Sequence, residues 1–279
     1  MSKPSAILMG SKAGAVVALS MILERGWDVK AVVTVEKNLH PWIAGPTLGE
    51  CAAAKGVRVM TQGELPRDLE ADFVISYMYR NRVKADVISM ARRAALNFHA
   101  GPLPEFGGWA FYSMAILENS REYGCTCHHM DNGFDTGPLL KVRRFPIDAS
   151  RETAHSLERK AQAEMVRLFG EFCEMAESGE ELPCEEQDAA KMRYLSREAF
   201  EALKRLPADA DAEMVDRYAR AFWYPPYRGA VMRAVTSPDE LDVEIIPGIV
   251  KQELAALLHA NDLRELQKVA AELRESVIG

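Results

Sequence analysis

The sequence predicts an α/β fold, in which a mostly parallel sheet carries helices on both faces and a small mixed α+β region follows. The first observation is that short β-type runs alternate with helical segments across the first half of the 279 residues. The second is that helix signals punctuate this alternation, with Thr47 as a typical N-cap and Gly26 and Gly56 as typical stops. Together they predict a Rossmann-like sheet.

The elements expected before residue 100 follow this alternation in order. Strands are expected at 6–9, 29–35, 72–77 and 95–99, and helices at 13–23, 47–55 and 84–93. After residue 100, we expect a helix at 109–119, strands at 123–130 and 138–145, and a long helix at 151–177. The start of that helix, with Ser150 ahead of Thr153, resembles a capped helix, and its apolar residues recur at helical spacing.

A polar, acidic run at 177–188, broken by Gly and Pro, is interpreted as a linker. It divides a domain at 1–180 from a small region at 190–279. In that region we expect helices at 197–206 and 212–222, an aromatic turn at 223–227 and strands at 230–235 and 241–246. The last thirty residues are amphipathic and predict a docked pair of helices, with a homodimer interface as one arrangement.

Composition restricts the classes of function. The net charge of −7 gives no general attraction to nucleic acid or to an anionic membrane. The N-terminus lacks the pattern of a secretory signal, and no apolar run is long enough to span a membrane. Five scattered cysteines favour a reduced, cytoplasmic protein. The turn at 9–14 lacks the G-x-G-x-x-G spacing, so no dinucleotide is expected there.

Two Gly-rich runs carry the candidate chemistry. The first, at 96–108, reads L-N-F-H-A-G-P-L-P-E-F-G-G and places Asn97 and His99 two residues apart at the end of a strand, hence on one face. The second, at 124–140, reads G-C-T-C-H-H-M-D-N-G-F-D-T-G-P-L-L and supplies Asp135. An isolated N-x-H has a structural role more often than a catalytic one. The constrained loop after it and the second turn favour function here.

These runs resemble the two signature motifs of the N10-formyltetrahydrofolate-dependent formyltransferases. N-F-H-A-G-P-L-P-E-F-G-G corresponds to the first motif and H-H-M-D-N-G-F-D-T-G-P-L to the second, in the family's order, and the resemblance extends over about residues 1–175. It implies N10-formyltetrahydrofolate as formyl donor and Asn97, His99 and Asp135 as the catalytic residues. It also implies that the segment 76–81 and the loop 131–134 form the walls of the pterin pocket, largely through backbone contacts. The residues concerned are Met78, Tyr79, Arg80, Asn81, Asp131, Gly133 and Phe134.

Each member of the catalytic trio has a physical role to match. An amine that attacks a formyl carbon creates an oxyanion, which the Asn97 amide and a His99 N–H could stabilise. His99 suits the proton transfers that the two nitrogens require. Asp135 would orient the imidazole, favour its protonated form and help to order a water that relays protons.

A metal site is the alternative interpretation of the nearby Cys and His residues. Strand alternation places Cys125, Cys127 and His129 on one face and His128 on the other. The spacing lacks C-x-x-C and a second ligand pair, so no metal is expected. His128 is interpreted as support for the active-site strand.

The acceptor is less determined than the donor. S-Y-M-Y-R at 76–80 and R-A-F-W-Y-P-P-Y at 220–227 resemble the sugar N-formyltransferases most, which implies a nucleotide-linked amino sugar. Hydroxyornithine, a carrier-bound amino acid and methionyl-tRNA remain alternatives; the last would call for a basic insertion and a full second domain. Trp109 and the residues after 248 depart from the family pattern. Formyltetrahydrofolate hydrolysis and folate binding without catalysis are the alternatives from other classes.

Overall fold

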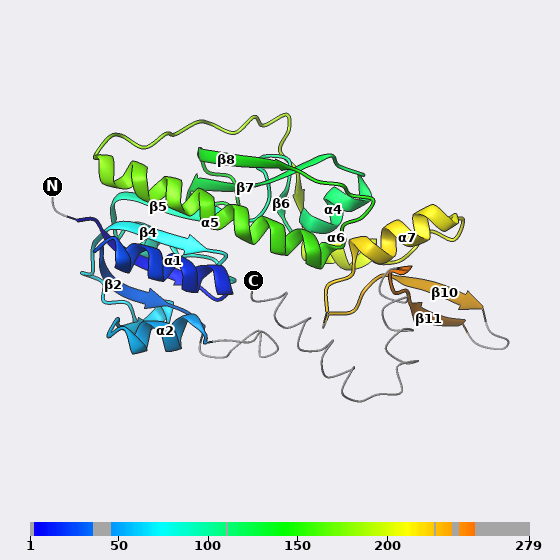
Figure 1. Ribbon diagram of the computed structural model, residues 1–279, viewed down its shortest axis with the longest axis horizontal. Coiled ribbons are helices and arrows are strands. Elements are labelled where there is room, and N and C mark those ends of the chain that lie inside the picture. Colours follow the sequence, from blue (N-terminus) through cyan, green and yellow to red (C-terminus); the bar gives the residue numbers. More distant parts are fainter. Residues whose placement is uncertain (1–2, 36–45, 110, 226, 236–239, 249–279) are drawn as a thin grey trace.

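The computed structural model describes residues 3–35, 46–109, 111–225, 227–235 and 240–248. Its centre is a seven-stranded sheet (Figure 1). The strands are β1 (Ser5–Gly10), β2 (Asp28–Val33), β3 (Val59–Met60), β4 (Ala71–Tyr77), β5 (Ala91–His99), β7 (Glu122–His129) and β8 (Leu139–Pro146). Their order is β3-β2-β1-β4-β5-β7-β8, with β1 to β5 parallel and β7 and β8 antiparallel to their neighbours. The predicted α/β class is confirmed.

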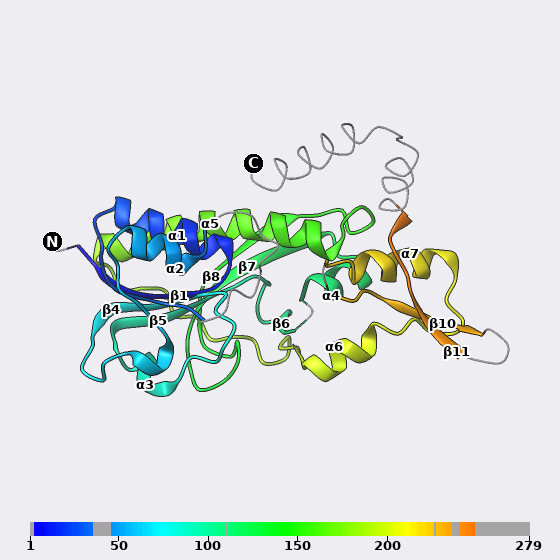
Figure 2. The ribbon, with the colours of Figure 1, turned by 90° about the horizontal axis from the view of Figure 1, so that it is seen from below.

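Helices cover both faces of this sheet (Figure 2). On one face lie α1 (Ala13–Glu24), α2 (Leu48–Ala54) and α5 (Ala154–Ser178), and on the other lies the short α3 (Ala85–Ile88). A further helical turn, η1, spans Gln62–Glu64. Alternate strand residues divide between two apolar cores, so that Phe98 packs beneath α5 while Ala95 belongs to the opposite core.

Helix α5 is formed as its sequence pattern predicts. Thr153 caps it in a reciprocal capping box with Ser156, and it ends at Gly179, whose φ of 81° suits glycine. The apolar stripe is buried along its whole length. It consists of Leu157, Ala161, Met165, Leu168, Phe169 and Phe172. The helix therefore lies across the sheet as its main cover.

The C-terminal region packs on the apolar core that lies beneath α5. It contains α6 (Arg197–Leu203), α7 (Ala212–Ala221) and a hairpin of β10 (Val231–Val235) with β11 (Glu240–Glu244). Helix α7 packs against α4 (Phe111–Leu117), and the buried Arg220 donates hydrogen bonds to the carbonyls of Ala149 and Glu152. These helices and strands lie where they were predicted. The predicted C-terminal helix pair lies outside the described residues.

The helix expected at 84–93 is much shorter, and the prediction was wrong at its end. Helix α3 stops at Ile88 and β5 begins at Ala91, because Ala91 pairs with Ala71 on β4. Arg92 forms an ion pair with Asp72, 3.0 Å between nitrogen and oxygen. Long-range pairing overrides the local helical pattern here.

The run interpreted as a linker is hydrogen-bonded to the central sheet. Glu185 exchanges two backbone hydrogen bonds with Leu139 on β8, at 2.7 and 2.9 Å. Further on, β9 (Tyr194–Leu195) pairs with β6 (Gly107–Gly108) in parallel. Residues 180–195, called the strap below, thus connect α5 to α6 across the Gly-rich loops. None of the described helices is both long and apolar enough to span a membrane.

Phe172 is the residue of choice for testing the role of α5. Its ring contacts Trp27, Phe73 and Phe98 at centroid distances of 5.3–6.0 Å. We expect Phe172→Ala to lower the free energy of unfolding by about 3–5 kcal/mol, because the cavity is closed in by the sheet. Urea unfolding measures this change. Glu174→Ala, at an exposed position on the same helix, should change it by less than about 0.5 kcal/mol. Equal effects would contradict the core assignment.

Candidate active site

Strand register places three polar side chains side by side. Asn97 on β5 lies opposite Ser76 on β4 and opposite His128 on β7. The Ser76 hydroxyl donates to Asn97 Oδ1 at 2.7 Å, and Asn97 Nδ2 lies 3.0 Å from His128 Nε2. His128 Nδ1 donates to the carbonyl of His129 at 2.9 Å, which leaves Nε2 as an acceptor for the Asn97 amide. This chain of hydrogen bonds fixes which way the Asn97 amide points.

His99 lies two residues further along β5 and faces the same side. Its Nε2 donates to the carbonyl of Phe106 at 2.7 Å, so Nδ1 is directed toward Asp135, 3.6 Å from Oδ1. The ring of Phe111 packs edge-on against the imidazole with a centroid distance of 4.8 Å. His99 is only 7% exposed, so these few neighbours form most of its surroundings.

The Asp135 carboxylate joins these groups. Oδ1 lies 3.5 Å from Asn97 Nδ2, and Oδ2 accepts the backbone N–H of Gly108 at 3.0 Å. Burial by itself would raise the pKa of Asp135. The charge of His99 and the Gly108 hydrogen bond outweigh it, and they hold the pKa well below its usual range. The carboxylate therefore stays ionised beside His99, and the three predicted catalytic side chains meet.

In the predicted loop at 131–134, some residues set the conformation of the loop and one lines a pocket. Asp131 accepts hydrogen bonds from the Gly133 N–H, at 2.8 Å, and from the Thr136 hydroxyl. A Cβ at Gly133 would collide with Thr136, so the tight turn excludes larger residues there. Phe134 is 52% exposed and faces a pocket. Asp131 and Gly133 thus set the shape of the loop that presents Phe134.

The other predicted binding segment lies beside this loop. Met78 has a left-handed backbone (φ 49°) and its sulfur contacts Gln162 Nε2 at 2.7 Å. Tyr79 packs against the second core, and Arg80 and Asn81 are exposed. None of these four residues lines the pocket described below.

Arg82, which the sequence analysis missed, connects the two segments. Its guanidinium donates to the carbonyl of Asn132 and lies 5.1 Å from the centroid of the Phe134 ring. Only its position, directly after the predicted binding segment that ends at Asn81, could have pointed to it.

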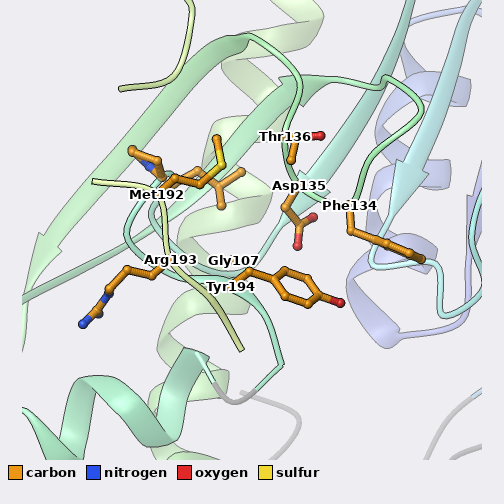
Figure 3. Close-up of a pocket in the computed structure, with 9 residues that line it drawn as sticks. Gly107, Phe134, Asp135, Thr136, Met192, Arg193 and Tyr194 are labelled. Atoms are coloured by element: carbon orange, nitrogen blue, oxygen red, sulfur yellow. The ribbon is translucent and has the colours of Figure 1, made fainter. Parts of the chain in front are cut away.

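A pocket of about 290 Å³ opens next to Asp135 (Figure 3). Its lining consists of Leu103, Pro104, Gly107, Phe134, Asp135, Thr136, Met192, Arg193 and Tyr194. The Asp135 carboxylate and the rings of Phe134 and Tyr194 lie around one opening, whereas the Arg193 side chain points away from it (Figure 3). A flat, mostly apolar group would fit here with one edge against a carboxylate.

The Cys and His residues of β7 form no metal site among the described residues. Cys125 and Cys127 are buried in the core beneath α5, and burial raises the pKa of Cys125 to about 12. His128 projects to the other face, as strand alternation predicts, where it contacts Asn97.

Part of the chain matches a known protein family. Residues 45–171 match the model of the formyl transferase family. The chain carries a formyl transferase domain. The match contains Asn97, His99 and Asp135, and it ends within α5.

Two named relatives differ in acceptor. The methionyl-tRNA formyltransferase of Myxococcus xanthus is 32% identical over 194 residues, covering 66% of this chain and 62% of the relative. The GDP-perosamine N-formyltransferase of Brucella melitensis is 26% identical over 170 residues, covering 61% of this chain and 64% of the relative. The chain therefore spans less than two thirds of these relatives.

Solved structures share the fold over a greater length. A 4-N formyltransferase from Francisella tularensis superposes with a TM-score of 0.70 at 15% identity, covering 88% of this chain and 98% of the other. The N-formyltransferase of Helicobacter canadensis, in complex with folinic acid and dTDP-3-aminofucose, gives 0.67 at 19% identity, with coverage of 86% and 95%. At these identities the likeness establishes the fold.

The ionised Asp135 makes stability depend on pH in one direction. Its pKa is lower in the folded than in the unfolded chain, so its contribution is fully present above the unfolded value of about 4. That contribution begins to fall as the pH drops to the unfolded value, and it is fully lost only once the pH has passed below the folded value. We compare the free energy of unfolding of the native protein with that of Asp135→Asn. The native value minus the variant value is expected to decrease as the pH is lowered from 5 to 3. Chemical denaturation at several pH values measures it, and a difference that does not change with pH would contradict the assignment.

Proposed function

We propose that this protein is an N-formyltransferase that moves a formyl group from N10-formyltetrahydrofolate to the amine of a nucleotide-linked amino sugar. The observation that carries the proposal is the meeting of Asn97, His99 and Asp135 on one face at the end of β5, with Oδ1 of Asp135 3.5–3.6 Å from the other two. The formyl transferase match supports the reaction class.

The Asn97 amide is held ready to donate a hydrogen bond. Ser76 occupies its oxygen, so its nitrogen is the end that faces His128 and Asp135. One N–H bonds His128, and the second, whose contact with Asp135 is long at 3.5 Å, is the donor that a carbonyl oxygen gaining negative charge during amine attack would find already oriented. Removing one such donor costs about 10²–10³ in rate in comparable sites.

His99 is placed to hold and move a proton. Nε2 donates to a carbonyl, and Nδ1 faces an ionised carboxylate that can accept a hydrogen bond from a proton on Nδ1. A proton held there can pass to a departing nitrogen, and the ring can then receive the proton that the attacking amine gives up. Asp135 keeps the ring oriented through both transfers.

The pocket beside Asp135 fits part of the proposed donor. Its mostly apolar walls, with Phe134 and Tyr194 at the opening, suit a flat heteroaromatic ring, and the carboxylate offers an acceptor for ring N–H groups. When bound, the donor supplies the formyl carbon. Met78 to Asn81 and the loop at 131–134 are proposed as further binding residues through their backbone, joined by Arg82.

The amino-sugar acceptor is supported by the structural likeness. It extends through 95–98% of the Helicobacter and Francisella chains, and the Helicobacter structure holds an amino sugar linked to a nucleotide. Methionyl-tRNA is the second candidate, because the Myxococcus relative is 32% identical. The net charge of −7 disfavours a tRNA substrate.

A mass-spectrometric transfer assay tests the proposal. The protein is mixed with N10-formyltetrahydrofolate and a panel of nucleotide-linked amino sugars, hydroxyornithine and charged initiator tRNA. We expect a formyl mass gain on one sugar, and a decrease of at least about 10² in kcat for Asn97→Ala, His99→Ala and Asp135→Ala.

Asn119→Gly, at an exposed left-handed turn away from the trio, is the matched control and should retain activity. Transfer to tRNA alone would overturn the sugar assignment. Formate release without any transfer would identify a hydrolase. Near-native activity of His99→Ala would contradict the mechanism.

A further inference from the structure

The strap reaches the site through Gln187. The Gln187 amide donates to the carbonyl of Asp135 at 2.8 Å and to that of Gly137 at 2.7 Å. Only the NH₂ end of the amide can face two carbonyls, and its Oε1 is buried without a partner among the described residues. Gln187 therefore binds the backbone on both sides of Thr136. These bonds lie next to the Asp135 carboxylate, which contacts both other members of the trio.

The turn at 135–137 has a backbone conformation that contacts from other segments must stabilise. Asp135 has φ of 57°, a left-handed conformation that is unfavourable for a residue with a Cβ. Gly137 packs so closely on the carbonyl of His129 that a Cβ could not fit, which fixes the far end of the turn. Without Gln187, the turn could relax toward ordinary φ values and carry the carboxylate away from His99.

Arg193 fixes the partners of Asp135 and His99 from the other end of the strap. Its backbone N–H donates to Pro104 O, and its carbonyl accepts from the Gly107 N–H, both at 3.1 Å. Its guanidinium donates to Glu105 O at 2.9 Å and forms a bidentate pair with Glu118, at 2.6 and 3.1 Å.

The loop held by Arg193 supplies two contacts of the catalytic pair. Phe106, whose ring lies 5.0 Å beneath the guanidinium, offers the carbonyl that accepts His99 Nε2–H. Gly108 supplies the N–H that binds Asp135. One end of the strap thus fixes the turn of Asp135, and the other fixes the loop that holds both members of the pair.

From these contacts we infer that the strap is part of the active site, with Gln187 and Arg193 as positioning residues that set the distance between His99 and Asp135. The inference rests on the proposed function for its kinetic consequence only, because the geometry concerns the resting protein. A displacement of about 1 Å in such a pair can cost on the order of 10² in rate.

The test separates positioning from activity. In protein labelled with ¹⁵N-histidine, the ring signals of His99 are assigned by their loss in His99→Gln. Asp135→Asn provides the spectrum of a ring without its carboxylate. We expect Gln187→Met, which keeps the volume and removes the donor, to move the His99 signals toward those of Asp135→Asn. Glu186→Gln, at the exposed neighbouring position, should leave them unchanged.

Kinetics give the second measurement. Gln187→Met should lower kcat by about tenfold or more while the dissociation constant for 5-formyltetrahydrofolate changes less than about threefold. Arg193→Lys keeps the charge but loses the bidentate guanidinium contact with Glu118. If Gln187→Met does not fold, this variant replaces it and is also expected to lower kcat and shift the His99 signals.

Unchanged His99 signals in both folded variants would overturn the inference, whatever the activity. Shifted signals in a native protein that transfers formyl to no acceptor would support the positioning role while the proposed function fails. A loss of donor binding in step with kcat would assign the strap to pocket structure and would also overturn the inference.

Discussion

The site depends on one largely buried carboxylate that stays ionised. Asp135 lies within 3.5–3.7 Å of Asn97, His99 and His128, and its second oxygen is bound by a backbone N–H. Burying a charge is costly unless the protein supplies compensating donors. Here Asn97 and His99 are both compensating donors and proposed catalytic groups, so contacts that make the charge tolerable also orient the amide and the imidazole.

The sheet produces this arrangement because the strand pairing changes from parallel to antiparallel at β5. On one side β5 pairs in parallel with β4, which brings Ser76 beside Asn97. On the other it pairs with the antiparallel β7, which brings His128 to the opposite side of the same residue. The connection after β7 then folds back over this face and carries Asp135. A strand end between two differently directed neighbours thus receives polar groups from three segments, while its other face stays in the core beneath α5.

The second constraint is that the carboxylate arrives on a left-handed turn. Such a turn is not stable by its own preference, and the chain holds it with contacts from far away in sequence. The strap follows α5, and α5 is anchored by the aromatic core and by the capping box at Thr153. Core packing, the position of the strap and the geometry of the trio therefore form one connected system.

The sequence by itself determined the α/β class, most of the helices and strands, and the face that Asn97 and His99 share, because these follow from periodicity over a few residues. Alternation also placed His128 away from the core cysteines. Only the tertiary structure decided that Ser76 and His128 fix the Asn97 amide, that Ala91 joins β5 rather than a helix, and that Gln187 and Arg193 reach the site. These contacts join residues 20 to 90 positions apart, so no local pattern contains them. A polar, acidic run with Gly and Pro has the composition of a linker, and its hydrogen bonds with Leu139 and Asp135 give it another role.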